Sequence, residues 1–279
     1  MVVAVDGRRY RCIRMHASSL IKLGHRLREV PSDDDVLRYD AFRAGFQPAL
    51  EEIERRCRGL VPLASSLTAR LKTLESTQAK LRRQASRLHR IQDIAGLRVV
   101  VANTVIQDEA LVALAAAFPS CHIDDYRVST QHGYRAVHVI VRSTSGHSVE
   151  IQLRTVPQNV WANLSELLAQ GLAPELKYGS GPPKALEALA SLSQVTTDFD
   201  EALAEVERRA RHAQGLLAML DTARSDEADD PAVAAGIEAE ALEHIEPMQP
   251  LFNTTRQLAD TLLEQAQALG RMIEGSTLP

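Results

Sequence analysis

Two acidic residues and several basic residues in this sequence are of the types that phosphoryl-transfer chemistry requires. Asp93 stands just before an apolar run, and Glu150 lies in the alternating stretch SVEIQLRT at 148–155. Paired carboxylates can hold Mg²⁺, and lysine or arginine side chains can neutralise a polyphosphate and the charge of its transition state. These residue types predict a pocket for an anionic substrate and favour a nucleotide as its occupant.

The stretch at 148–155 alternates apolar and polar residues, so we expect it to form a β-strand. One face of that strand carries three apolar residues, Val149, Ile151 and Leu153. The other face carries three polar residues, Glu150, Gln152 and Arg154. A polar row of this kind is also typical of the solvated face of an edge strand. The strand alone therefore leaves two interpretations open, a solvated face or the floor of an active site.

The segment SLTARLKTLESTQAKLRRQASRLHR, at 66–90, predicts one long helix that begins near Ser65 or Ser66. At about 100° per residue, five leucines share one arc of roughly 100°, the width of a core-facing stripe. The opposite face gathers polar and basic residues, namely Lys72, Ser76, Lys80, Arg83 and Arg87. A basic face without interleaved acids either binds an anion or is an idle surface, and the helix alone does not decide.

The following segments predict a compact α/β domain over about residues 60–160. The run 97–102 is rich in valine and apolar on both faces, as expected for a central strand. EALVALAAAF at 109–118 predicts a short buried helix, and DYRVSTQHGY at 125–134 a polar loop. RAVHVIVR at 135–142 predicts a second strand, which a turn at Gly146 connects to the strand at 148–155. A sheet flanked by helices follows from this order.

Composition excludes several other classes of protein. Aromatic residues make up 4% of the 279 residues and the net charge is -4, which argues against a surface that stacks or coats nucleic acid. The three cysteines, Cys12, Cys57 and Cys121, form no CxxC pair, and the nine histidines are scattered, so no zinc site or disulfide framework is indicated. A GxxxxGK[ST] loop is absent. With no signal peptide and no membrane-spanning stretch, we expect a cytoplasmic protein.

Four segments in this order, ARLKTLEST followed by Lys80, DIAGLR, HGYRAVH and VEIQLRT, resemble the synthetase domain of the RelA/SpoT alarmone synthetases. The resemblance covers about residues 65–165. It implies a nucleotidyltransferase-like mixed sheet flanked by helices, with a helical C-terminal extension. It also implies a pyrophosphokinase that moves the β,γ-pyrophosphate of ATP to the ribose 3′-hydroxyl of GDP or GTP and releases AMP.

The resemblance assigns roles to individual residues. ATP-binding residues would be Arg70, Lys72, Ser76, Lys80 and Arg83. Asp93 and Glu150 would be catalytic and would hold Mg²⁺, the expected cofactor. The acceptor nucleotide would contact Tyr134, which would stack on its base, and also His138, Gln152 and Arg154.

The sequence departs from the family pattern on the acceptor side, where VSTQH lacks the usual proline and lysine. Ser165 and Glu166 stand where an acid and a histidine are usual. A toxin-type relative that pyrophosphorylates the 3′-CCA end of tRNA, or makes adenosine alarmones, is therefore an alternative. The arginines that would contact tRNA phosphates are Arg82, Arg83, Arg87 and Arg90. A catalytically inactive regulatory module is an alternative of another class, and the intact Asp93 and Glu150 speak against it.

We expect three parts along the chain: a helical or irregular segment at 1–60 that packs on the core, a synthetase domain at 61–180, and a helical extension at 181–279. The long relatives carry an HD-type hydrolase domain before the synthetase domain. About 60 residues are too few for such a domain, so no hydrolase activity is expected. The C-terminal helices are expected to mediate homo-oligomerisation or to bind an antitoxin, and no membrane partner is expected.

Overall fold

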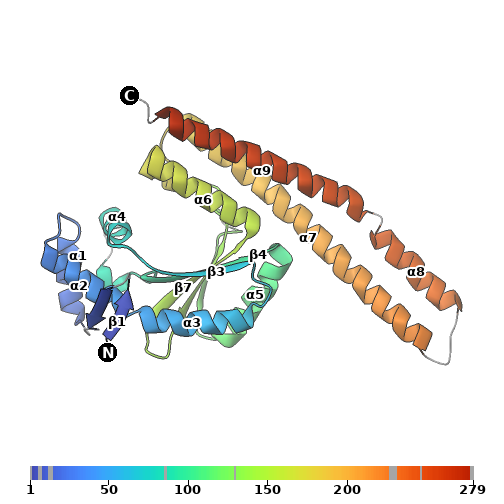
Figure 1. Cartoon of the computed structure of the whole chain (residues 1–279), viewed down its shortest axis with the longest axis horizontal. Coiled ribbons are helices and arrows are strands. Elements are labelled where there is room, and N and C mark those ends of the chain that lie inside the picture. Colours follow the sequence, from blue (N-terminus) through green and yellow to red (C-terminus); the bar gives the residue numbers. More distant parts are fainter. Residues whose placement is uncertain are drawn as a thin grey trace. The chain divides into compact units, whose positions relative to one another are not determined.

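The computed structural model describes residues 2–5, 8–11, 15–84, 87–128, 130–225, 231–245 and 247–276 (Figure 1). Cys12, residue 129 of the predicted polar loop and the acidic break at 226–230 lie outside the described residues. The chain divides into two compact units. Unit 1 comprises Met1–Val100, Ala110–Asp125 and Val137–Leu153, and unit 2 comprises Val101–Glu109, Tyr126–Ala136 and Arg154–Pro279.

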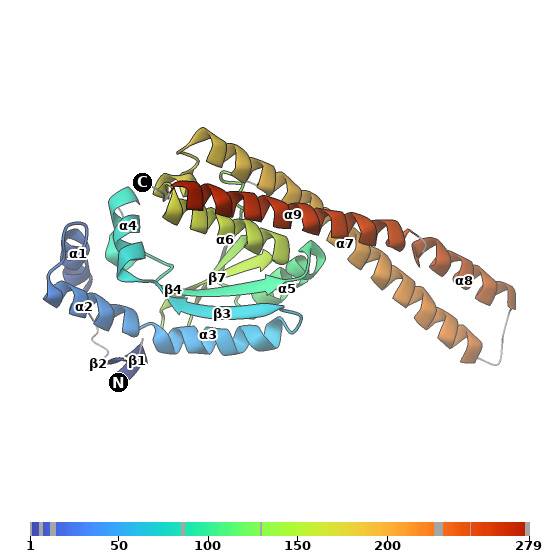
Figure 2. The same ribbon diagram turned by 45° about the horizontal axis from the view of Figure 1, so that its top comes forward.

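A five-stranded sheet has the strand order β3-β4-β7-β6-β5. The strands are β3 (Ser66–Leu71), β4 (Ala95–Val101), β5 (His122–Asp125), β6 (Val137–Arg142) and β7 (Ser148–Thr155). β3 pairs antiparallel with β4, and β6 pairs antiparallel with both β5 and β7. The arrows of β4 and β7 point the same way, so the sheet is mixed (Figure 2). The predicted α/β class with a mixed sheet is confirmed.

The two central strands carry the apolar patterns on which the prediction rested. In β4, Leu97 and Val99 are buried, and in β7 Val149, Ile151 and Leu153 are fully buried. β7 lies between β4 and β6. It is therefore not an edge strand, and the polar row that includes Glu150 is not the solvated face of an edge.

Several further helices and a hairpin belong to unit 1. A hairpin of β1 (Val2–Val5) and β2 (Arg8–Arg11) comes first. The helices are α1 (Ala17–Arg26), α2 (Asp33–Ala44), α3 (Gln47–Leu60), α4 (Leu74–Gln84) and the short 3-10 helix η1 (Leu88–Arg90). α2 begins with a capping box, in which Ser32 and Asp35 each accept a hydrogen bond from the other's backbone N–H. α3 lies along the sheet beside β3 (Figure 2).

The single helix predicted from about residue 65 is wrong in its first part. Residues Ser66–Leu71 form β3, whose register runs from Ser66 opposite Val100 to Leu71 opposite Ala95. The leucine spacing that fits a helix also fits strand alternation, because Leu67, Ala69 and Leu71 are two residues apart. Pairing with β4 decides between the two, and the helix begins only at Leu74.

Two boundaries in the sheet region also differ from the prediction. The predicted polar loop at 125–134 begins inside β5, a short and largely exposed edge strand that carries little apolar signal. The helix predicted at 109–118 is α5 (Thr104–Ala117) and begins five residues earlier. Asn103 caps it, since its side-chain oxygen accepts a hydrogen bond of 3.0 Å from the backbone N–H of Ile106.

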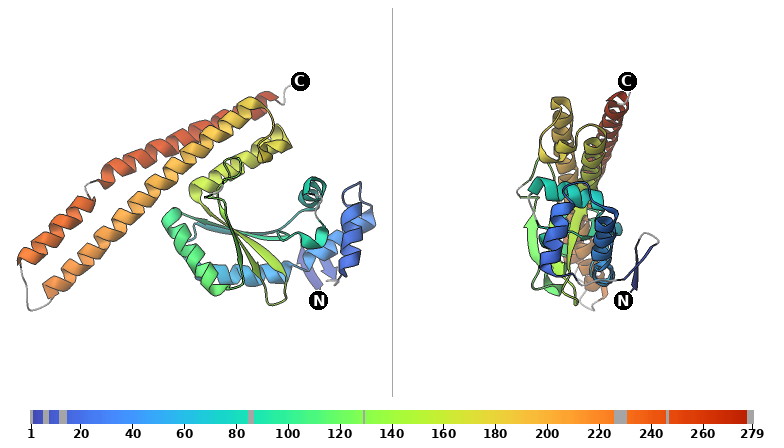
Figure 3. Two further views of the ribbon diagram at one scale, coloured as in Figure 1. Left: turned by 180° about the vertical axis from the view of Figure 1, so that it is seen from behind. Right: turned by 90° about the vertical axis from the view of Figure 1, so that its left-hand side faces the viewer.

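The C-terminal extension in unit 2 is helical, as expected. Its elements are α6 (Val156–Gly171), the short 3-10 helix η2 (Pro174–Tyr178), α7 (Pro183–Ser225), α8 (Pro231–Ile245) and α9 (Met248–Ser276). α8 and α9 run back along α7 (Figures 1 and 3). Trp161 on α6 donates a hydrogen bond of 3.0 Å to the carbonyl of Leu189 on α7, within a core shared by these two helices. No helix in the described ranges is long and apolar enough to cross a membrane.

A chain of buried polar side chains lies inside unit 2. Gln158 donates to Asp200 (3.1 Å) and accepts from Gln107 (2.9 Å), which in turn accepts from Arg127 (3.2 Å). Asp200 is 5% exposed, and its Oδ1 accepts no hydrogen bond from any residue that the structure describes. Burial raises the pKa of Asp200 to about 6, although hydrogen bonds from Thr155 and Gln158 oppose the rise. The ionised carboxylate is therefore a cost to unit 2 at neutral pH.

Replacing Asp200 by asparagine should stabilise unit 2 at neutral pH. The folded-state pKa of Asp200 lies above the ordinary value of 3.8, so its contribution to stability is full below that value and is lost as the pH rises through about 6. Asp200→Asn removes the ionisation and should raise the free energy of unfolding by up to about 3 kcal/mol above pH 7.

Urea unfolding followed by circular dichroism at about pH 4 and about pH 7.5 tests this expectation. The stabilisation of Asp200→Asn relative to the unmodified protein should be much smaller at the lower pH. A gain of the same size at both pH values, or a loss at the higher one, would contradict it. Asp221→Asn, at an exposed position of α7, is the control for removing a carboxylate from the same helix.

Candidate active site

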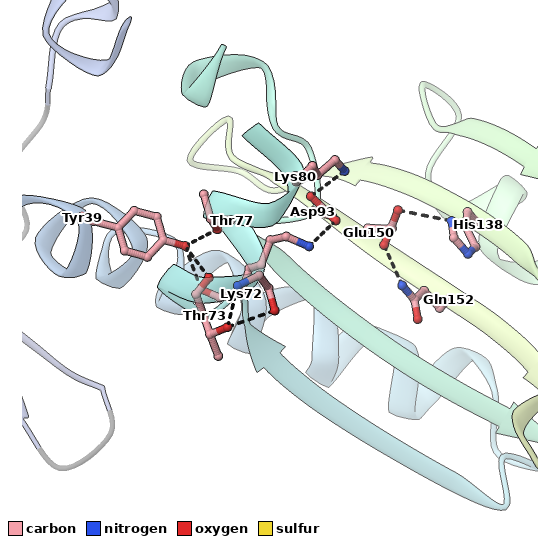
Figure 4. A network of polar contacts seen from close by, with 10 residues as sticks. Tyr39, Lys72, Thr73, Thr77, Lys80, Asp93, His138, Glu150 and Gln152 are labelled. Carbon is pink, nitrogen blue, oxygen red and sulfur yellow. Dashed lines mark hydrogen bonds and ion pairs between the residues drawn. The ribbon is translucent and has the colours of Figure 1, made fainter. Parts of the chain in front are cut away.

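Asp93 lies between two lysine ammonium groups in unit 1 (Figure 4). Lys72 Nζ donates a hydrogen bond of 2.9 Å to Asp93 Oδ2, and Lys80 Nζ lies 3.0 Å from Oδ1. Lys72 follows β3 directly, and its backbone N–H donates to the carbonyl of Ile94 (2.8 Å). Lys80 comes from α4. The break between strand and helix, absent from the sequence prediction, therefore brings both lysines to one carboxylate.

The lysines control the charge on Asp93. Burial alone would raise its pKa, but the positive charges of Lys72 and Lys80 and their hydrogen bonds outweigh burial and hold the pKa below the ordinary value of 3.8. Asp93 is thus an anion across the physiological pH range. Lys72 is only 9% exposed, and a buried ammonium of this kind also needs the carboxylate as its partner.

Glu150 is the second carboxylate of the site and projects from β7. Its Oε1 lies 3.2 Å from His138 Nδ1, and its Oε2 accepts a hydrogen bond of 2.8 Å from Gln152 Nε2. The β6–β7 register produces this arrangement, since His138 stands opposite Gln152 and Ile140 opposite Glu150. His138 and Gln152, both predicted as acceptor-binding residues, are therefore direct partners of Glu150.

The pKa of Glu150 also lies below its ordinary value of 4.5. Burial is the largest single cause and raises this pKa, but the hydrogen bond and charge of His138, together with the hydrogen bond from Gln152, give a net lowering. The negative charge of Asp93 acts in the opposite direction and raises it. Two carboxylates that feel each other's charge and are both ionised at neutral pH provide an electrostatic site for a divalent cation.

A cavity of about 160 Å³ opens between these groups in unit 1. It is lined by residues of β3, β4 and β7, together with the segment before β4, among them Arg70, Asp93, Arg98, Glu150 and Gln152. Arg70 is exposed on β3, so its guanidinium is accessible to a ligand in the cavity. The sequence analysis missed Arg98. A single charged residue inside the otherwise apolar strand AGLRVVV was the available signal.

The remaining predicted ATP-binding residues lie on α4. Ser76 is in its first turn, where its backbone N–H and side chain both contact the Thr73 hydroxyl at 3.2 and 3.0 Å. Arg83 is exposed in the last turn of the same helix, whereas Arg87 lies beyond the helix end. The basic face predicted for one continuous helix is therefore formed by a loop, a short helix and the segment that follows.

Tyr39 on α2 is a further residue that the sequence analysis missed. Its ring is fully buried, and its hydroxyl contacts the Thr77 hydroxyl at 2.6 Å and donates to the carbonyl of Lys72 at 2.9 Å (Figure 4). Burial raises the pKa of Tyr39 to about 12, so it stays a neutral donor. Tyr39 thus anchors Lys72, in the segment before α4, and Thr77, in the first turn of α4. No local sequence pattern signals such a contact, because the partners are 33 and 38 residues away.

In unit 2, Tyr134 and Arg154 contact each other. Arg154 donates a hydrogen bond of 3.0 Å to the Tyr134 hydroxyl, and its guanidinium carbon lies 5.3 Å from the ring centroid. The Tyr134 ring also contacts Trp161 at 6.2 Å and Tyr126 at 5.8 Å between centroids. A cavity of about 130 Å³ is lined by residues of this group and of α6 and η2, including Ser165, Glu166 and Lys177. An aromatic ring held from several sides is suited to stacking on a planar ligand.

Fold and site together define an α/β protein with a cation-lined pocket that holds two ionised carboxylates. Residues 69–180 match the region found in RelA / SpoT proteins. The uncharacterized protein Rv1366 of Mycobacterium tuberculosis is 36% identical over 163 residues, which are 55% of this chain and 56% of that protein. The chain thus spans little more than half the length of this curated relative. GTP pyrophosphokinase YjbM of Bacillus subtilis is 29% identical over 203 residues, which are 64% of this chain and 93% of that protein.

Solved structures give the same result. The crystal structure of small alarmone synthetase 1 from Bacillus subtilis is 27% identical, covers 63% of this chain and 98% of its own, and superposes with a TM-score of 0.54. The structure of that synthetase bound to its product pppGpp has a TM-score of 0.51 and the same identity, and covers 61% of this chain and 96% of its own. Residues 69–180 thus match the RelA/SpoT family model, and the resemblance that the four motifs predicted is confirmed.

Removing the Tyr39 hydroxyl should lower the stability of unit 1 and leave every charged side chain of the site in place. Tyr39→Phe leaves the buried Thr77 hydroxyl and the Lys72 carbonyl without this partner, which should lower the free energy of unfolding by about 1–2 kcal/mol. Denaturant unfolding measures the loss. Tyr178→Phe, which removes a tyrosine hydroxyl from a half-exposed side chain, is the control. Equal stability of Tyr39→Phe and the unmodified protein would contradict the anchoring role.

Proposed function

We propose that this protein is a pyrophosphokinase that transfers the β,γ-pyrophosphate of ATP to the ribose 3′-hydroxyl of GDP or GTP and releases AMP. The observation that carries the proposal is the pairing of Asp93 and Glu150 on the wall of one cavity, with Lys72, Lys80 and Arg70 beside them. Two anions that favour a divalent cation and three cations that favour a polyphosphate match the charges of an ATP-dependent phosphoryl transfer.

The cations on β3 and α4 are proposed to bind the triphosphate. Lys72 and Lys80 now neutralise Asp93, and both ammonium groups can move to phosphate oxygens once a divalent cation balances the carboxylate. Arg70 can make bidentate contacts to a phosphate, which suits its planar guanidinium. Ser76 and Arg83 are proposed to complete the ATP contacts from α4.

Asp93 and Glu150 fit a Mg²⁺ ion in the chemistry of their donor atoms. Both are carboxylates, the ligands that Mg²⁺ prefers, and each Asp93 oxygen lies within 3.0 Å of a lysine ammonium group, a positive charge that a divalent cation could replace. Bound Mg²⁺ would neutralise charge on the transferred phosphates. The low pKa of Glu150 suits a permanently ionised metal ligand better than a strong base. His138, 3.2 Å from Glu150, is proposed to take up the proton of the attacking hydroxyl when its imidazole is neutral.

Tyr134 and Arg154 are proposed to bind the acceptor, with the Tyr134 ring stacked on its base. A guanine acceptor is supported by two relatives: a protein named GTP pyrophosphokinase, and a synthetase solved with its product pppGpp. Neither the hydroxyl of Tyr134 nor the stacking face of its ring selects guanine by itself. Acceptor identity therefore has to be tested directly.

Neutral replacements of the two carboxylates should abolish transfer. Asp93→Asn and Glu150→Gln each remove one negative charge expected to hold Mg²⁺, and each should lower the rate at least about 100-fold. The assay incubates the protein with ATP labelled in the β,γ-phosphates, Mg²⁺ and, in parallel, GDP, GTP, ADP, ATP or bulk tRNA, and separates the labelled products. Asp221→Asn on the exposed surface of α7 is the matched control and should keep full activity.

The outcomes distinguish the alternatives. Label on GDP or GTP supports the proposal, and label on tRNA or on an adenine nucleotide replaces it with a toxin-type activity. Nucleotide binding without any labelled product indicates a regulatory module. Full transfer activity in both Asp93→Asn and Glu150→Gln would overturn the assignment of the active site.

The role of Tyr134 is testable by a pair of substitutions. Stacking on a base contributes about 1–3 kcal/mol, so Tyr134→Ala should raise KM for the acceptor about tenfold or more. Tyr134→Phe keeps the ring and removes the hydroxyl that accepts a hydrogen bond from Arg154, so its KM should change much less. KM for ATP should stay the same in both variants. An equal effect of the two substitutions on the acceptor would refute stacking as the function of the ring.

A further inference from the structure

Two histidines and a glutamate from different helices come together in unit 2. His212 lies on α7, and Glu240 and His244 lie on α8. The four-residue spacing of Glu240 and His244 places both on the same face of α8. One potential ligand atom from each of the three residues lies within 4.8 Å of the other two. None of these residues takes part in the proposed active site.

This group contains a second histidine in addition to the His212–Glu240 ion pair. His212 Nε2 lies 3.6 Å from Glu240 Oε1, and the rings of His212 and His244 have centroids 4.0 Å apart. An ion pair would need one imidazole only, and two protonated imidazoles this close would repel each other. Ala213 and Ala241, which follow His212 and Glu240 in the sequence, are 5% and 3% exposed. Small buried residues beside the group allow the backbones of two packed helices to approach closely.

The geometry is close to that of a metal site. Zinc–nitrogen and zinc–oxygen bonds of about 2.0–2.2 Å with tetrahedral angles bring ligand atoms to roughly 3.3–3.5 Å from one another. The ligand atoms here lie within 4.8 Å of one another, and His212 Nε2 is 3.6 Å from Glu240 Oε1. Small side-chain movements bring them to the separation in a metal site, because the His212 and Glu240 side chains are half exposed. Two imidazole nitrogens and one carboxylate oxygen suit Zn²⁺ and its first-row neighbours, whereas Mg²⁺ and Ca²⁺ prefer an all-oxygen set.

We propose that His212, Glu240 and His244 bind one divalent transition-metal ion of the Zn²⁺ class, with the remaining coordination position open to water. The ion links α7 to α8 through side chains of both helices. Because it binds only when the two helices are packed together, it stabilises the pair of helices by an amount that grows with the logarithm of its concentration once that concentration exceeds the dissociation constant. This inference is independent of the proposed pyrophosphokinase activity.

Zn²⁺ and Co²⁺ are the probes for this site, and the full chain is the sample. Zn²⁺ affinity is measured by competition with a chromophoric chelator, and Co²⁺ gives visible absorption bands that report its ligand geometry. We expect one equivalent to bind the unmodified protein. His212→Ala and His244→Ala should each weaken binding at least tenfold, and Glu240→Gln should weaken it less, because one neutral oxygen ligand is left.

Matched controls separate this site from the other potential ligands of the chain. Glu243→Gln removes the same charge from an exposed position of α8, and His122→Ala removes an exposed histidine of β5, so both should bind as the unmodified protein does. Cys121→Ser removes a partly exposed thiol and should also leave binding unchanged. If Cys121→Ser abolishes binding instead, the ion is held by that thiol and the proposal fails.

A second measurement does not depend on affinity. Zn²⁺ should raise the thermal midpoint of the helical signal in the unmodified protein and in Glu243→Gln, and should leave that of His212→Ala unchanged. Circular dichroism before metal addition shows whether each variant is folded. The absence of metal binding by the unmodified protein, or equal binding by His212→Ala and His244→Ala, would overturn the proposal.

Discussion

The ion pairs of Asp93 with Lys72 and Lys80 are the interaction on which the proposed active site depends. A buried carboxylate alone would take up a proton or stay solvated, and a buried lysine alone would lose one. Together they keep three charges in unit 1, with the Lys72 and Lys80 ammonium groups 2.9 and 3.0 Å from the Asp93 carboxylate. The ion pairs also hold three segments together, since Lys72 follows β3, Lys80 belongs to α4 and Asp93 precedes β4. The charges of the site therefore depend on the positions of these segments, and the ion pairs in turn stabilise those positions.

The same arrangement gives each carboxylate a distinct environment. Asp93 is surrounded by lysine ammonium groups, whereas Glu150 is held by a histidine and an amide from the neighbouring strand positions. The two acids are close enough to influence each other's pKa, yet both remain ionised. In a site of this kind both carboxylates are already ionised and oriented before the substrate binds, so the free-energy cost of arranging these charges is met during folding.

The sequence predicted those parts of the fold that local patterns determine. β4 was recognised because its run is apolar on both faces, β7 because apolar and polar residues alternate along it, and the extension because long helical stretches leave a clear signal. β3 was mistaken for helix because its leucines fit both periods, and only pairing with β4 decides. Tyr39 escaped notice because its hydrogen bonds reach residues more than 30 positions away. The grouping of His212 with Glu240 and His244 likewise exists only once α7 and α8 are packed. Arg70 was predicted as an ATP-binding residue from family resemblance alone.

The length of α7 has a consequence for how unit 2 unfolds. Its 43 residues span about 65 Å, and toward its C-terminal end α7 packs against α8. Residues there are held mostly by their immediate neighbours across the hairpin, so opening that end breaks few contacts elsewhere in the unit. Amide hydrogens near Leu220 should therefore exchange through local fraying, while those near Leu192, in the core shared with α6, should exchange only when that core opens. The local stability of α7 therefore falls from the core shared with α6 toward the end that packs against α8. An ion or a protein bound at that end can stabilise it without a change in the packing near Leu192.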